Sequence, residues 1–225
     1  MKYTLLLFLT IATITVNGQN HFVGIQSGVN YTRVINDHFP KNKVNFRTGL
    51  VIGITYDYQF KKNFSIGSGI IYNQRGYTRD IVFSPTYTGE PNDLIFIYKV
   101  NRDFISLPLK IGFNCGKELF AYGNIGLTPS VLVEAYDVHP KLDFNGNDLP
   151  ERSVWNKDLV YKFDIGGLAE VGGGYKFTNH FWLYSSLLFQ HSFAPIFNYD
   201  RSPDAEIIHY GWSLSLGFKY ALTKE

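Results

Sequence analysis

Six histidines, with nearby serines and carboxylates, are the side chains of this 225-residue chain that could support catalysis. A serine beside a histidine would suit acyl transfer or hydrolysis, because the imidazole can take the hydroxyl proton. The closest such pair in the sequence is His191-Ser192. Neighbouring residues of a strand point to opposite faces, so this pair cannot make the contact there. The histidines are His21, His38, His139, His180, His191 and His209.

A metal site is the second chemistry that the sequence offers. Asp137, His139 and Asp143 could share one face of a loop, and carboxylate and imidazole groups are common metal ligands. Two carboxylates and one histidine in a polar segment are more often a solvated surface. The sequence also lacks the H-E-x-x-H, P-loop and G-x-S-x-G motifs. We therefore expect no enzyme activity, no cofactor and no metal, with a lipid-modifying membrane enzyme as an alternative.

A set of ionisable residues lies among glycines, serines and asparagines that alternate with apolar residues. Both signs of charge occur in the set, which predicts a network of buried ion pairs. The alternative is a narrow path for ions. The set consists of Asp57, Arg75, Lys110, Glu134, Lys162, Asp164, Glu170, Lys176 and Lys219.

The elements that carry these residues are strands, because apolar residues recur along the chain with a period of two. In the segment Arg47–Phe60, the even-numbered residues from Leu50 onward are all apolar or aromatic. The segment Phe181–Phe189 is ambiguous in phase, since residues 187–189 are all apolar. Eight strands are predicted, over Val23–Tyr31, Arg47–Phe60, Phe64–Arg75, Ile105–Phe113, Ile125–Glu134, Phe163–Phe177, Phe181–Phe189 and Trp212–Tyr220.

The connections between these strands alternate in length. Short turns at one rim and long loops at the other are typical of an outer-membrane β-barrel. An even number of strands puts both termini on the side of the short turns, which would be the periplasmic side. The short connections are residues 61–63, 115–118 and 178–180, and the long ones are 32–46, 78–101, 136–158 and 190–208.

The composition helps to decide which face of the strands meets lipid. Aromatic residues make up 17% of the chain, yet the mean hydropathy is only −0.09. That average excludes a helical membrane protein, which needs runs of about 20 apolar residues. In a soluble barrel or sandwich, the alternative, the polar face would carry many charges, whereas here it is rich in glycine and serine. The apolar face ends in Tyr, Phe or Trp near strand termini, as in the aromatic girdles of membrane barrels.

We therefore predict an all-β fold, an eight-stranded antiparallel up-and-down transmembrane β-barrel with long outer loops and short periplasmic turns. A barrel of eight strands is just wide enough for its lumen to be filled by side chains. The lumen is expected to be plugged by the charge network of Asp57, Arg75, Lys110, Glu134, Asp164, Glu170 and Lys219.

One segment resembles a known family. In Phe104–Phe113, Leu107, Pro108, Leu109 and Lys110 form a strand motif with an internal proline, an unusual residue within a strand. This motif is similar to that of the PorT-like small outer-membrane β-barrel family. Lys110 follows Pro108 by two residues, where family members often have three or four. The resemblance implies an eight-stranded barrel in the outer membrane, and the namesake assists a protein-secretion system.

The first 18 residues have the pattern of a signal peptide. Lys2 precedes an apolar run from Leu5 to Val16, and small residues follow. A membrane anchor or a buried strand is the alternative. We predict a signal peptide over residues 1–18, a barrel domain over 19–225, and location in the bacterial outer membrane after Sec-dependent export.

The partners follow from this placement. They are outer-membrane lipid, the barrel-insertion machinery during assembly, and a protein or glycan at the long loops, whose aromatic residues include Tyr77 and Tyr98. The net charge of +2 gives no reason to expect nucleic acid. The predicted function is a barrel of structural or interaction type with a plugged lumen. A narrow porin or transporter for small solutes is the alternative.

Overall fold

The computed structural model describes residues 20–35, 44–60, 63–83, 94–142, 148–155, 160–195 and 207–222. The predicted signal peptide, residues 1–18, lies outside these ranges. No helix among the described residues is long and apolar enough to cross a membrane. Within the described ranges the strands are β1 (Asn20–Ile35), β2 (Val44–Gln59), β3 (Phe64–Phe83), β4 (Leu94–Ser106), β5 (Leu109–Gly116), β6 (Leu119–Leu142), β7 (Asp148–Trp155), β8 (Phe163–Lys176), β9 (Phe181–Ser192) and β10 (Ile208–Ala221).

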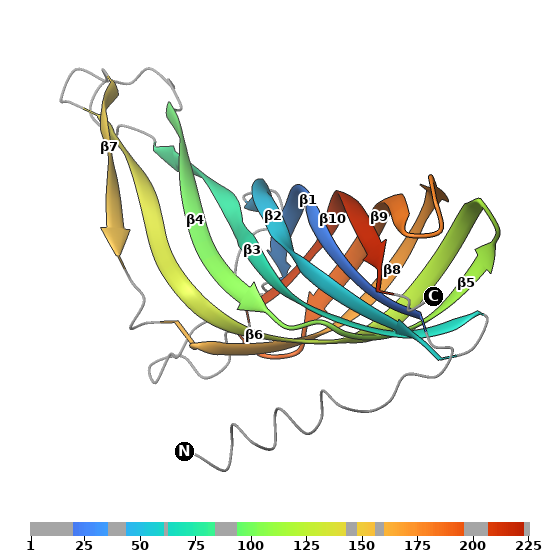
Figure 1. Cartoon of the computed structure of the whole chain (residues 1–225). Coiled ribbons are helices and arrows are strands. Elements are labelled where there is room, and N and C mark those ends of the chain that lie inside the picture. The colour runs from blue at the N-terminus through green and yellow to red at the C-terminus, as the bar shows by residue number, and fades with distance from the viewer. Residues whose placement is uncertain are drawn as a thin grey trace, which may run out of the picture.

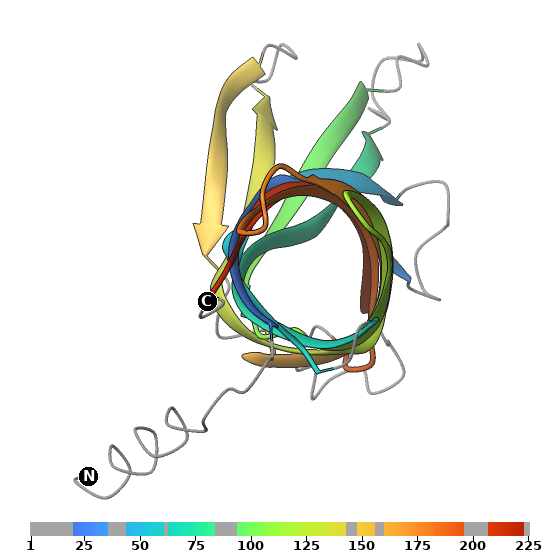
Figure 2. The same cartoon turned by 45° about the vertical axis from the view of Figure 1, so that its right-hand side comes forward.

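The strands close into a ring of antiparallel neighbours (Figure 2). β1 pairs with β2 on one side and with β10 on the other, so the first and last strands meet. From β10 the ring continues through β9, β8 and β6, then β4 with β5, then β3 and back to β2. β4 and β5 share one position, because both lie between β3 and β6. The described wall therefore has eight strand positions, which confirms the predicted eight-stranded antiparallel barrel.

The break between β4 and β5 falls at Leu107 and Pro108. Proline has no N–H group to donate to a neighbouring strand. The wall stays connected at this point, because the N–H of Leu107 donates to the carbonyl oxygen of Pro129 at 2.8 Å. Leu107 and Leu109 are about half exposed on the outer face, whereas Pro108 and Lys110 are buried on the inner face.

The two ends of the barrel differ in their connections. At the turn end, residues 60–63, 117–118 and 177–180 connect strands, and β1 begins and β10 ends. At the opposite loop end lie the longer connections. In Figure 1 the turn end is on the right and the loop end on the left.

Side chains alternate between the two faces along most of the wall. In β10, Ser213 and Ser215 are buried, while Leu214 and Leu216 are 57% and 65% exposed. The same alternation settles the ambiguous strand β9, where Ser186 is buried and Leu187 is exposed. The side chain of Leu188 therefore points into the lumen.

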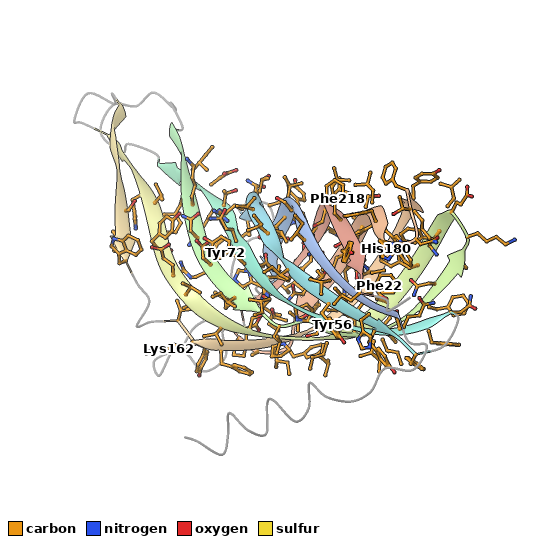
Figure 3. All side chains as sticks on the ribbon, viewed as in Figure 1. Phe22, Tyr56, Tyr72, Lys162, His180 and Phe218 are labelled. Atoms are coloured by element: carbon orange, nitrogen blue, oxygen red, sulfur yellow. The ribbon has the colours of Figure 1, made fainter. Side chains whose placement is uncertain are left out.

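The outer face is an apolar belt bordered by aromatic residues at both ends, and Figure 3 shows Tyr56 and Phe218 among its outward side chains. At the loop end, Tyr31 stacks on Phe46 with 4.4 Å between ring centroids, and Phe189 lies 4.7 Å from Trp212. At the turn end, the exposed aromatic residues are Tyr56, Phe60, Phe64, Phe113, Tyr175, Phe177, Phe181 and Tyr220. This is the arrangement of a membrane barrel with its girdles.

Three strands of the ring, β3, β4 and β6, continue beyond it at the loop end, and β7 joins them there. β6 pairs with β8 only as far as Val131, yet runs on for eleven residues to Leu142, about 36 Å of extended chain. Along this length it pairs with β4 and with β7, which has no other described neighbour. We call residues 76–83 of β3, 94–101 of β4, 132–142 of β6 and all of β7 the projecting sheet (Figure 1, upper left).

The projecting sheet corrects the predicted extent of two loops. Residues 78–101 and 136–158 were expected to be long loops, and much of each is strand in the structure. The described strands also continue to Ile35 and Ser192 and begin at Val44, inside the other expected loops. Outside the membrane both faces of a sheet can carry polar residues, so the apolar alternation that reveals a strand is lost.

Candidate functional site

The lumen contains three buried ion pairs, one above another along the barrel axis. From the loop end to the turn end, they join Arg75 to Asp164, Lys110 to Glu170, and Lys219 to Asp57. Each pair links two strands that are not neighbours in the ring, so each passes over at least one intervening strand inside the lumen. The structure thus brings together six of the seven residues of the predicted charge network.

Arg75, which is 3% exposed, is the cation of the upper pair, the one nearest the loop end. Its Nη1 lies 2.6 Å from Asp164 Oδ2, and its Nη2 donates to the hydroxyls of Ser106 and Ser130. The guanidinium carbon also lies 4.6 Å from the ring centroid of Phe104. These contacts compensate much of the cost of burying the charge.

Lys110 and Glu170 form the middle pair, with 2.8 Å between Nζ and Oε2. Glu170 is 3% exposed and also accepts a hydrogen bond from Asn124 Nδ2 at 2.8 Å. Lys110 is the last residue of the motif that resembles the PorT-like family. The motif therefore places a cation in the lumen directly after the break in the wall.

Lys219 and Asp57 form the lower pair, at 2.7 Å. The ammonium group of Lys219 also lies 4.7 Å from the ring centroid of Tyr184 and 5.4 Å from that of Tyr122. These tyrosines, with Phe120, form a buried aromatic cluster against which Trp182 packs. Aromatic side chains therefore fill much of the lumen at the turn end.

A fourth ion pair at the loop end was missed by the sequence analysis. Arg102 is fully buried and its Nη1 lies 2.7 Å from Asp137 Oδ1. The hydroxyl of Tyr98 donates to Asp137 Oδ2 at 2.6 Å, and the ring of His139 packs edge-on against Tyr98. Tyr98, Asp137 and His139 fell within expected loops, and Arg102 lay between such a loop and the strand expected from Ile105. In β4, charges occur on both faces of the strand, so no alternation marked Arg102 as inward.

Glu134 departs from the predicted network. The pairing of β4 with β6 shifts between Asp103 and Phe104, which leaves Val133 as an extra residue. Beyond this bulge Glu134 lies opposite Asp103, and Asp103 Oδ2 accepts a hydrogen bond from the outward-facing Tyr72. Glu134 therefore lies on the outer side of the wall, because a bulge reverses the phase of the residues that follow it.

Two other lysines of the alternating set also lie outside the core of the lumen. Lys162 is exposed before β8, on the surface (Figure 3). Lys176 is half-buried at the turn end, where its ammonium group lies 4.1 Å from the ring centroid of Trp182.

An apolar cluster closes the lumen at the loop end. Its members come from the ends of several strands and from short segments next to β8 and β10, and all are at most 5% exposed. Tyr98 packs against it. The cluster comprises Val34, Val44, Tyr77, Val100, Phe104, Leu132, Ala135, Val160 and Ile207.

Three cavities in the described lumen are small. One beside Arg75 and His209 has a volume of about 10 Å³, one beside Lys110 about 40 Å³, and one beside Asp57 about 20 Å³. A single water needs about 10–15 Å³ of such volume. Each of these three cavities can thus hold at most a few waters and has no room for a sugar or an amino acid.

The candidate catalytic groups do not assemble. His191 lies on the outer wall beside Phe193, whereas Ser192 is buried and donates to Asp164 Oδ2 at 2.9 Å, as expected for neighbours in a strand. His209 faces the lumen next to Phe104. Asp143, one of the candidate metal ligands, lies outside the described residues. Among those that are described, no three His, Cys, Asp or Glu side chains are grouped as a metal site.

The closed eight-position ring, its apolar belt and its two aromatic girdles define a transmembrane β-barrel of the bacterial outer-membrane class. A family model described as an outer membrane protein beta-barrel domain matches residues 17–198. The chain belongs to this family, which locates it in the bacterial outer membrane.

Several solved structures are similar to this chain. Neisserial surface protein A has 12% identity and a TM-score of 0.47, with 91% of this chain and 99% of that chain covered. OprG from Pseudomonas aeruginosa has 11% identity and a TM-score of 0.45, with coverage of 92% and 97%. The outer membrane protease OmpT from Escherichia coli has 12% identity and a TM-score of 0.41, with coverage of 93% and 100%. No curated protein matches the sequence.

Proposed function

We propose that the protein is a non-conducting, non-enzymatic outer-membrane barrel of the PorT-like kind, whose projecting sheet binds a protein partner outside the membrane. Assisting a secretion system is one role that such a barrel would serve. The barrel part would anchor and orient the sheet. Export by the Sec system, with residues 1–18 as signal peptide, and assembly by the barrel-insertion machinery belong to the same proposal.

The projecting sheet is the observation that carries this proposal. Three strands of the barrel extend past the ring, and β7 pairs with one of them. One part of this sheet packs into the apolar cluster at the loop end, and another part keeps large apolar side chains exposed. Trp155 at the end of β7 is 63% exposed and Ile97 of β4 is 52% exposed. Large exposed apolar side chains on a rigid sheet are typical of protein-binding surfaces.

The filled lumen supports the non-conducting part. Four ion pairs, the aromatic cluster at the turn end and the apolar cluster at the loop end occupy it in sequence along the axis. A permeating solute would have to displace buried, paired charges, which is costly. This arrangement favours an interaction protein over the narrow porin.

Site-specific photo-crosslinking in intact cells tests the proposal. A photoreactive amino acid in place of Trp155 should give a discrete protein adduct. The same residue in place of Leu216, which is 65% exposed in the apolar belt, should give none and is the matched control. The proposal fails if neither position 155 nor position 97 gives a protein adduct above the level at position 216.

A register-preserving deletion gives the second test. Asp80 and Ile97 are directly opposite in the β3–β4 pair, so residues 81–96 can be replaced by Asn-Gly, which favours a tight hairpin turn. Tyr98 and its bond to Asp137 are retained. The shortened barrel should still show heat-modifiable mobility on gels but lose the adduct at position 155. Retention of the adduct would exclude the β3–β4 tip as part of the binding surface.

A further inference from the structure

A cavity at the turn end belongs neither to the lumen network nor to the projecting sheet. It has a volume of about 440 Å³ and lies between two adjacent hairpin turns, β5–β6 and β8–β9. This size falls in the range of small-ligand sites. Its lining residues are Lys117, Glu118, Tyr175, Lys176, Phe177, Thr178, Asn179 and Trp182.

The walls of this cavity are held by hydrogen bonds. The N–H of Lys176 donates to the carbonyl oxygen of Glu118 at 2.9 Å, which ties one turn to the other. In the second turn, the hydroxyl of Thr178 accepts from the N–H groups of His180 and Phe181 at 3.2 and 3.0 Å. A preformed cavity binds a ligand without the entropic cost of ordering its walls.

The cavity carries a net positive charge. Lys176 and Lys117 contribute two cations against the single carboxylate of Glu118. The ammonium group of Lys176 is fixed 4.1 Å from the ring centroid of Trp182 and 5.8 Å from that of Phe120. Cation–π contacts of this kind hold the charge at one place. The ligand that fits is therefore an anion.

The position of the cavity identifies the kind of anion. Tyr175 and Phe177 on its rim are 41% and 59% exposed on the outer wall, and they continue the aromatic girdle of Phe181 and Tyr220. Such girdles lie at the depth of lipid headgroups. The acyl chains of a ligand here would lie against the outer belt. Its anionic group would reach over the rim of the wall at the turn end, because the ammonium group of Lys176 lies over the inner-face rings of Trp182 and Phe120.

We propose that this cavity binds the headgroup of an anionic phospholipid, with its phosphate between Lys117 and Lys176. The inference rests on the proposed membrane placement of the turn end, but not on the binding of a protein partner. Bound lipid would hold the turn end of the barrel at a fixed depth in its leaflet.

Native mass spectrometry of the full-length protein tests this site. The protein is incubated with equal amounts of phosphatidylglycerol and phosphatidylethanolamine that have the same acyl chains. Both lipids carry the phosphate, but phosphatidylethanolamine also carries an ammonium group, which the two lysines repel. Each lysine near an anionic lipid surface is worth about fivefold in binding, so the wild type should prefer phosphatidylglycerol by up to the order of 25-fold. The double variant Lys117→Gln/Lys176→Gln should bind the two lipids about equally, and Lys117→Arg/Lys176→Arg should keep the preference.

Lys162→Gln, which removes an exposed lysine away from this cavity, is the matched control and should behave as wild type. Heat-modifiable mobility establishes that each variant is folded. The inference is overturned if wild type shows no preference, or if the double glutamine variant keeps it. Displacement of the lipid by an equal concentration of glycerol phosphate would mean that the site binds free phosphate. Binding of a cell-wall muropeptide without lipid preference would assign the cavity to peptidoglycan instead.

These outcomes are separable from the proposed function. Crosslinking at position 155 should be unchanged in the double glutamine variant, because the two sites lie at opposite ends of the barrel.

Discussion

The middle ion pair offers a quantitative test of whether the lumen is plugged. Lys110→Met removes the partner of Glu170, a carboxylate that is 3% exposed. Leaving one buried charge without its partner costs about 3–5 kcal/mol of unfolding free energy. Lys219 also interacts electrostatically with Glu170, so we expect a loss near the lower end of this range. Glu170→Gln, which keeps an acceptor for Asn124, should cost a similar amount, because Lys110 loses its direct partner and keeps the electrostatic interaction with Asp57.

The double variant Lys110→Met/Glu170→Gln should lose much less than the sum of the two. Replacing both members of a buried pair with neutral groups is often close to neutral, so we expect a loss of about 0–2 kcal/mol. The double-mutant cycle should then give a coupling of about 4 kcal/mol or more.

The assay is urea unfolding of the protein in liposomes, followed by the fluorescence of its three tryptophans. Lys162→Met, at an exposed site, is the control and should stay within about 0.5 kcal/mol of wild type. In a water-filled lumen the same pair would behave as a surface salt bridge, worth about 0–1 kcal/mol. Single-variant losses and a coupling both below about 1 kcal/mol would refute the reasoning.

Three further predictions concern the wall, the upper pair and a turn. Ile125→Arg places a charge on the outer face, midway along the part of β6 that pairs with β8 (Leu119–Val131), where Ile125 is 65% exposed. It should cost about 2–4 kcal/mol in liposomes, and an unchanged unfolding free energy would mean that this face does not meet lipid. Arg75→Met should cost about 3–5 kcal/mol in the same assay, because Asp164 keeps a buried charge, and a loss below about 1 kcal/mol would contradict that burial. Gly116→Ala should cost about 1–3 kcal/mol, because Gly116 has φ of +104° and an added Cβ would lie 2.2 Å from the carbonyl oxygen of Leu119; a neutral result would contradict this turn geometry.

The fold could be predicted from the sequence because the membrane imposes a sharp contrast between the two faces of each strand. Where one face meets lipid and the other a crowded lumen, as around Leu214 and Ser215, the period of two is unmistakable. The contrast disappears beyond the membrane. The ends of β3 and β6 and the whole of β7 therefore show no alternation of apolar and polar residues. For this reason the projecting sheet was not predicted.

The same reasoning explains what was predicted of the lumen. Alternation identified Arg75, Lys110 and Glu170 as inward-facing, but it could not match cation with carboxylate. The two residues of each ion pair lie on strands that are not neighbours. Their positions along the barrel axis depend on the tilt and stagger of the strands. Glu134 was wrongly predicted to face the lumen, because the bulge at Val133 turns the residues after it to the opposite face. The residue types around Val133 do not indicate a bulge.

We propose that this barrel anchors a binding surface and that its filled lumen conducts no solute. Single-channel recording in planar bilayers tests the second statement most directly. The purified full-length protein should insert without producing steady channels, while a known porin prepared in the same way gives them. Lys110→Met/Glu170→Gln should stay closed as well, because the apolar cluster at the loop end and the aromatic cluster at the turn end remain. Steady, reproducible openings of large conductance from the wild-type protein would contradict the account.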